Sequence, residues 1–153
     1  MFDCVCCDKC IPVCPNDANF SYRLAPQRIE FHDWVVKPDG SPKPGPAGIL
    51  HVKREHQIGT FADFCNACGN CDTFCPEEGA PFKVKPNFFG SHKGWREAAI
   101  DGFYIETADA VRRIHGRMDG SEYALEHDTA SDTWLFTCGG AIAVFASLAA
   151  TPE

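Results

Sequence analysis

The feature that most constrains this chain is a cysteine pattern that occurs twice. Residues 4–15 and 65–76 both follow the spacing C-x2-C-x2-C-x3-C-P. The cysteines in this pattern are Cys4, Cys7, Cys10, Cys14, Cys65, Cys68, Cys71 and Cys75. The spacing is typical of bacterial sequences that bind two [4Fe-4S] clusters. It therefore predicts an electron carrier in which these eight thiolates are the metal ligands.

The spacing also predicts which thiolates share a cluster. Three thiolates separated by two residues each can surround one cluster, because the backbone between them coils around it. The fourth thiolate follows a longer step and is free to reach the neighbouring cluster. The predicted sets are Cys4, Cys7, Cys10 and Cys75 for the first cluster, and Cys65, Cys68, Cys71 and Cys14 for the second. Cys6, beside Cys7, is a second candidate for the position of Cys4.

Three other interpretations of the cysteines compete with this one. A zinc site needs four ligands, and it explains neither the third Cys of each run nor the Pro that follows the fourth. A disulfide framework requires an oxidising compartment, and residues 1–15 lack the apolar stretch of a signal peptide. A cytoplasmic location is expected instead. The third interpretation is that the clusters are structural and do not change their redox state.

Composition and charge narrow the range of partners. The chain has 153 residues and a formal net charge of −7, to which two clusters bound by eight thiolates would add about −4. This negative charge would repel a polyanion such as nucleic acid. A protein partner with a basic face is expected, and its association should weaken as salt rises.

Between the two runs, the sequence predicts an inserted β-rich segment. Residues 19–24 and 28–36 are rich in β-branched and aromatic residues and are predicted to form half-buried strands. Residues 38–48 are predicted to be a loop, because seven of the eleven are Pro or Gly. Residues 49–56 alternate again and are predicted to form a strand.

After the second run, strands are predicted at 102–106 and 122–126, and one or two helical turns at 95–100. Residues 108–117 fit either a strand or a short helix. The stretch 134–150 carries no charge, but Gly139 and Gly140 divide it and no Lys or Arg flanks it, so a membrane span is not favoured. A strand to Cys138, a Gly turn and a helix of small residues are predicted there.

The sequence around the cysteines resembles that of a known family. The matching stretches are residues 14–19, 56–71, 74–76 and 81–83. They resemble the carboxy-terminal iron-sulfur region of large oxidoreductases described as selenate reductase subunits, whose central part is similar to the FAD- and NADPH-binding small subunit of glutamate synthase. The runs themselves resemble two-cluster bacterial ferredoxins. No G-x-G-x-x-G occurs in this chain, so the resemblance implies that flavin chemistry belongs to another polypeptide.

Together these observations predict an α+β fold with a ferredoxin-like two-cluster core. The expected domains are a dicluster domain at 1–90, with an insertion at 16–64, and a β-rich carboxy-terminal extension at 91–153. The expected function is single-electron transfer between a reductase and a redox enzyme, with no catalytic residues in the chain itself. The resemblance implies a flavin-dependent or molybdenum/tungsten oxidoreductase as partner. The alternative function is a structural iron-sulfur module of a larger complex.

Overall fold

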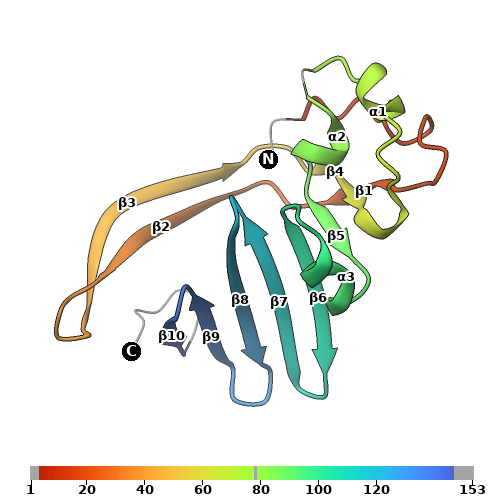
Figure 1. Cartoon of the computed structure of the whole chain (residues 1–153). Helices are drawn as coiled ribbons and strands as arrows, with labels where there is room; N and C mark the ends of the chain where they lie inside the picture. The colour runs from red at the N-terminus through yellow and green to blue at the C-terminus, as the bar shows by residue number, and fades with distance from the viewer. Residues whose placement is uncertain (1–3, 78, 147–153) are drawn as a thin grey trace.

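A computed structural model describes residues 4–77 and 79–146, and β-strands dominate it (Figure 1). Eight strands form one mixed sheet. In spatial order they are β1 (Asn19–Arg23), β4 (His56–Phe61), β5 (Asn87–Phe89), β6 (Gly102–Ala108), β7 (Val111–Met118), β8 (Ser121–Asp128), β9 (Thr133–Cys138) and β10 (Ala141–Phe145). β5 pairs in parallel with β4 and β6, whereas the other neighbours pair antiparallel. Of the strands in the described residues, only β2 and β3 lie outside this sheet.

The predicted ferredoxin-like α+β core is wrong. Within residues 4–77 and 79–146 the helices are short: η1 (Ala62–Phe64), α1 (Asn70–Thr73), α2 (Pro81–Val84) and α3 (His92–Glu97). The glycine and proline content around the second run explains why α1 and α2 are short. Gly69 precedes α1 with a φ of 84°, and Gly79 and Pro81 limit the helix that could form after Cys75. The division into domains at residues 90 and 91 stays a prediction.

The carboxy-terminal half is an antiparallel meander from β6 to β10. Strands were predicted at 102–106 and 122–126, and both are present and longer. The segment that was left open is β7, a strand whose Arg113 and Ile114 pair with β6 and β8. The predicted small-residue helix after the Gly turn is wrong over Ala141–Phe145, which forms β10. Gly139 and Gly140 have φ angles of 54° and 83°, as the two-residue turn of an antiparallel hairpin requires. The rest of the predicted helix, residues 147–150, lies outside the described residues.

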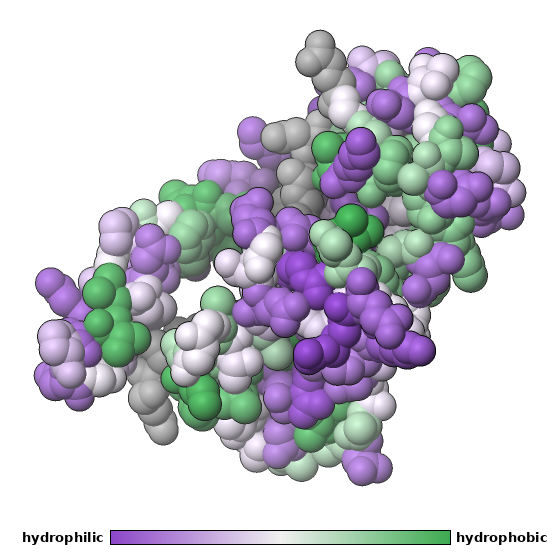
Figure 2. All heavy atoms as spheres, viewed as in Figure 1, coloured by the Kyte–Doolittle hydropathy of each residue, from purple (hydrophilic) through white to green (hydrophobic). Residues whose placement is uncertain are grey.

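A separate two-stranded hairpin of β2 (Gln27–Val36) and β3 (Pro42–Val52) projects from the sheet. β3 runs through most of the predicted loop at 38–48. A two-stranded ribbon has a free edge on each strand, and prolines are tolerated at such an edge because they have no N–H to donate. The expectation of half-buried strands is also wrong for β2, where only Trp34 is not exposed. Figure 2 shows hydrophobic side chains gathered over this hairpin.

α3 packs on one face of the sheet and orders the side chains beneath it. Ser91 begins the helix, because its hydroxyl oxygen accepts a hydrogen bond from the Gly94 N–H at 3.0 Å. Trp95 is 3% exposed, and its indole N–H donates to the Gly102 carbonyl oxygen. The opposite face carries the aromatic side chains of Phe20, Phe88 and Phe103, whose neighbouring ring centroids are 5.7 and 6.0 Å apart. No helix in the described part of the chain is long and apolar enough to cross a membrane.

Candidate functional site

The pairing of β1 with β4 brings the two cysteine runs to the same end of the sheet. β1 begins at Asn19, directly after the first run, and β4 ends at Phe61, directly before η1 and the second run. Because Asn19 lies opposite Thr60 in an antiparallel pair, the end of one run lies close to the start of the other. Figure 1 shows the loop of the first run beside the segment around α1.

The two runs share a small core. Cys10 and Cys71 are each 7% exposed and pack with Ile58, and Cys4 contacts the same cluster. The other predicted ligands lie around it: Cys14, Cys65 and Cys75 are partly buried, and Cys7 and Cys68 are exposed. None of the ten cysteines is in a disulfide. The thiols of both runs are therefore not tied up in disulfides and can serve as metal ligands.

The backbone of the two runs has the same conformation at equivalent positions. In each run the residues just before and just after the second cysteine have positive φ: Cys6 (55°) and Asp8 (61°) in the first, Ala67 (55°) and Gly69 (84°) in the second. Such angles are uncommon for residues other than glycine and cost backbone energy. Two unrelated loops would not be expected to adopt positive φ at the same positions.

The turn hydrogen bonds repeat in the same way. The Ile11 N–H donates to the Asp8 carbonyl oxygen at 2.9 Å, and the equivalent Asp72 N–H donates to Gly69 at 3.0 Å. The Cys14 N–H donates to Ile11, and the equivalent Cys75 N–H donates to Asp72. Backbone that alternates between right- and left-handed conformations turns successive N–H groups toward one side, which is the arrangement of anion and iron-sulfur nests.

Two backbone N–H groups are already directed at sulfur. The Cys6 N–H donates to Cys4 Sγ at 3.3 Å, and the Ala18 N–H donates to Cys14 Sγ at 3.2 Å. Hydrogen bonds to ligand sulfurs raise the reduction potential of an iron-sulfur cluster. These contacts are therefore of the kind that tunes a cluster as well as holding its ligands.

The donor types fit an iron-sulfur cluster, but their sulfur atoms are not gathered around one point. Among residues 4–77 and 79–146, no group of three or more Cys, His, Asp or Glu side chains is placed to hold a metal ion. Burial, followed by the neighbouring Cys4, raises the pKa of Cys10 to about 11, so this thiol stays protonated at neutral pH without a metal. The ligand sets, including the crossing of Cys14 and Cys75, stay predictions.

Cys6 is used differently from the other cysteines of its run. Its thiol donates to the His56 carbonyl oxygen at 2.9 Å and also lies 3.3 Å from the Cys4 carbonyl oxygen. This geometry favours Cys4 over Cys6 as the first ligand. Cys138 lies on β9, opposite Tyr123 of β8 and away from both runs.

Polar side chains that spacing did not identify support the first run. Asn19 is 4% exposed, donates to the Cys10 carbonyl oxygen at 2.9 Å, and accepts a hydrogen bond from the fully buried Thr60 hydroxyl at 2.9 Å. Arg54 donates to the Cys4 carbonyl oxygen. His56 Nε2 lies 2.6 Å from the Asp8 carboxylate, so the histidine nearest the second run in sequence contacts the first run in space. These roles depend on the register of β1 and β4, which cysteine spacing does not reveal.

Comparison with known proteins gives a distant similarity. No protein-family model and no solved structure matches the chain. Over 123 residues, or 80% of its length, the chain is 28% identical to a protein of Escherichia coli K12 named "Putative oxidoreductase YgfK", and equally to its counterpart in Escherichia coli O157:H7. The chain spans only 9% of the length of these relatives. The similarity supports a link to an oxidoreductase.

Proposed function

We propose that this chain is an electron-transfer unit that binds two [4Fe-4S] clusters through its cysteine runs. The observation that carries the proposal is the repetition of backbone conformation in two runs of free cysteines, at Cys6 and Asp8 and again at Ala67 and Gly69. When bound, such clusters supply one-electron redox chemistry. The chain supplies the thiolates and the N–H groups that hydrogen-bond to their sulfurs. It adds no catalytic residue of its own.

The expected partner is a component of a larger oxidoreductase, with flavin or molybdenum/tungsten chemistry on that component. The similarity to a much longer protein named as an oxidoreductase supports this proposal. The formal charge of −7 favours a partner with a basic face. Electron transfer between the two should therefore slow as ionic strength rises, because salt screens the attraction between their surfaces.

Anaerobic reconstitution tests the proposal directly. After incubation with iron and sulfide, the chain should hold about eight irons and show an EPR signal on reduction with dithionite. Cys138→Ser is the matched control, because Cys138 lies outside both runs and its loss should leave the iron content unchanged. Tightly bound zinc in place of iron, or iron that Cys138→Ser removes, would contradict the proposal.

A structural role for the clusters is the second candidate, and the small core around Cys10, Ile58 and Cys71 favours it. A domain with so few buried apolar side chains at one end gains stability from metal binding. Redox titration separates the two roles. Clusters that accept electrons at potentials within reach of dithionite are expected for a carrier. Clusters that stay oxidised while the fold depends on them would identify a structural module.

A further inference from the structure

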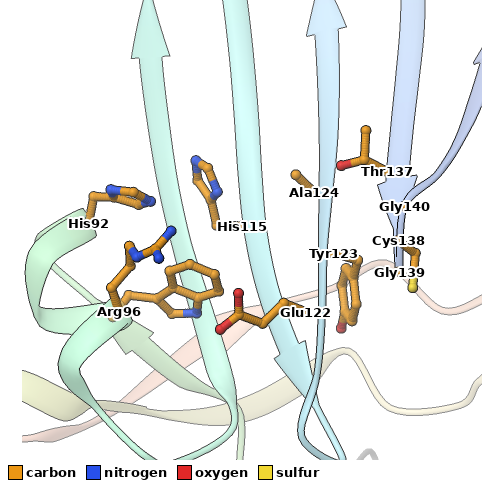
Figure 3. Close-up of a pocket in the computed structure, with 11 residues that line it drawn as sticks. His92, Arg96, His115, Glu122, Tyr123, Ala124, Thr137, Cys138, Gly139 and Gly140 are labelled. Atoms are coloured by element: carbon orange, nitrogen blue, oxygen red, sulfur yellow. The ribbon is translucent and has the colours of Figure 1, made fainter.

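A hollow on the sheet, apart from both cysteine runs, has the features of a ligand site. It lies between α3 and strands β7, β8 and β9 and has a volume of about 340 Å³ (Figure 3). Ala124 forms its floor. This short side chain lies opposite His115 on β7 and opposite Thr137 on β9. The Gly139–Gly140 turn closes one end without side chains. The hollow exists because short residues stand between bulky ones.

One wall of the hollow is a stack of aromatic rings. The His92 ring stacks on Trp95 with centroids 5.7 Å apart and an angle of 21° between the planes, and the His92 and His115 centroids are 4.7 Å apart. The Arg117 guanidinium lies 4.9 Å from the Trp95 ring and donates to the carbonyl oxygens of Trp95, Ala98 and Ile100. These contacts fix the end of α3 and hold the buried Trp95 behind His92, so the flat surface that a ligand would meet is preformed and belongs to the His92 ring.

Arg96 is the charged side chain of the hollow that could bind a ligand anion. The Glu122 carboxylate is paired through one oxygen with Arg117, whose Nε and Nη2 atoms lie 3.3 and 2.8 Å from it. The hydrogen bond from Arg117, and after it the nearby charges that include Arg96, lower the pKa of Glu122, so Arg96 faces this carboxylate without a close ion pair. Farther along the same face, Glu106 and Glu126 are both paired with Arg113, and His115 Nε2 lies 3.4 Å from Glu106. Arg96 has neither an ion pair nor a side-chain hydrogen bond to the described residues. Figure 3 shows Arg96 and His92 on α3 reaching toward His115 and Glu122 on the strands.

We infer that this hollow binds a small planar carboxylate. A guanidinium presents parallel N–H groups that match a carboxylate in a two-point hydrogen-bonded pair. The aromatic wall suits a flat, partly apolar body, and 340 Å³ is at the lower end of the volumes of small-molecule sites. Inorganic phosphate has no apolar body and would make no ring contact with His92 or His115. The inference is independent of whether the cysteine runs hold clusters.

Benzoate titration of the full 153-residue chain, followed by 1H–15N NMR, tests the inference. Benzoate should shift the amide signals of Trp95, Gly139 and Gly140, and benzamide, which has the same shape but no charge, should bind at least about tenfold more weakly. Arg96→Ala should raise the Kd for benzoate by about tenfold. Lys93→Ala is the matched control, because Lys93 is on the same helix, 83% exposed and outside the hollow. The Lys93→Ala variant should bind benzoate with the same Kd as the unmodified chain.

Filling the hollow gives a second, charge-neutral test. Ala124→Leu should abolish the benzoate shifts while the other amide signals of β7 and β9 keep their positions. Arg96 is exposed, so Arg96→Ala leaves the sheet intact and tests the inference even if Ala124→Leu fails to fold. Equal binding of benzoate and benzamide, an unchanged Kd in Arg96→Ala, or tighter binding of phosphate at the same amides would each overturn the assignment to a planar carboxylate.

Discussion

Positive φ angles on both sides of Cys68 show how single residues shape the second run. Gly69 has a φ of 84°, and a Cβ built on it would meet no atom within 4 Å. Ala67 has a φ of 55°, which an L-residue with a Cβ adopts only at an energetic cost. A Cβ at position 69 would therefore cost free energy through the backbone conformation alone, and not through steric contact.

We predict opposite effects of the two exchanges at these positions. Gly69→Ala should lower the free energy of unfolding by about 1–2 kcal/mol, because only the backbone conformation is penalised. Ala67→Gly should leave stability unchanged or raise it by up to about 1 kcal/mol, because glycine removes the same penalty while adding chain entropy to the unfolded state. Urea unfolding of both variants measures the difference. Destabilisation by both changes to the same extent would show that φ does not control these positions.

Asn19 illustrates a buried polar residue whose role is to hold a neighbouring segment. We predict that Asn19→Ala lowers the free energy of unfolding by about 1–3 kcal/mol, because it leaves the Thr60 hydroxyl and the Cys10 carbonyl oxygen without partners. Asn16→Ala, at an exposed asparagine in the same loop, should change it by less than about 0.5 kcal/mol. Iron content after reconstitution should fall in the first variant and stay constant in the second.

At the scale of elements, β7 is held between two strands by Arg113. Its guanidinium lies 2.7 Å from Glu106 on β6 and 2.8 Å from Glu126 on β8. The hydrogen bond from Arg113, followed by that from His115, lowers the pKa of Glu106. A carboxyl group with a lowered pKa stabilises the fold above its unfolded value of 4.5, and this contribution is lost as pH falls through the lower folded value.

We therefore predict that Arg113→Leu reduces the acid sensitivity of the fold. The stability difference between the unmodified chain and Arg113→Leu should shrink as pH falls from about 5 to about 3, because protonated Glu106 no longer gains from Arg113. At pH 7 the difference should be about 1 kcal/mol, since these side chains are partly exposed. Urea midpoints of both proteins, measured without added iron and sulfide at each pH, give this difference. Lys93→Met, which removes an exposed ion pair, should show no such trend.

The β2–β3 hairpin is the element least tied to the sheet. Its base is closed by the Leu24 N–H, which donates to Glu55 at 2.8 Å, and Arg28 lies opposite His51 just above it. We predict that replacing residues 29–50 with Asn-Gly changes the free energy of unfolding by less than about 1 kcal/mol, because the removed side chains are mostly exposed. Equilibrium unfolding of the shortened chain measures this. A large loss of stability would mean that the hairpin packs on the sheet in solution.

For the whole molecule, sequence patterns predicted several of the strands but not the architecture of the sheet. Cysteine spacing gave the eight candidate ligands, and local residue composition predicted the strands β1, β2, β6 and β8, because both signals are local. The last residues of β3 fall in the strand predicted at 49–56, but its first part, Pro42 to Gly48, was missed because its prolines suit a free edge, which is known only once the strand order is known. β10 was missed because alanine is a weak strand former, and its pairing with β9 decided the outcome. The hollow beside α3 joins residues from four elements, so no stretch of sequence could reveal it.

The proposed arrangement of two clusters involves the whole molecule, because each predicted ligand set draws on both runs. We predict that Cys14→Ala damages the cluster of Cys65, Cys68 and Cys71, and that Cys75→Ala damages the cluster of Cys4, Cys7 and Cys10. The physical reason is that the fourth cysteine of each run follows a longer step than the first three. The pairing of Asn19 with Thr60 brings the runs close enough for such an exchange.

Each damaged cluster can be identified by combining two changes. Cys7→Ser with Cys75→Ala should lose no more iron than either change alone, because both affect the same predicted cluster. Cys7→Ser with Cys14→Ala should lose iron from both clusters, so the two losses should add. Iron analysis and EPR of the three single and two double variants measure these sums after anaerobic reconstitution. If the losses add in the first pair and not in the second, each run binds its own cluster and Cys14 and Cys75 do not cross.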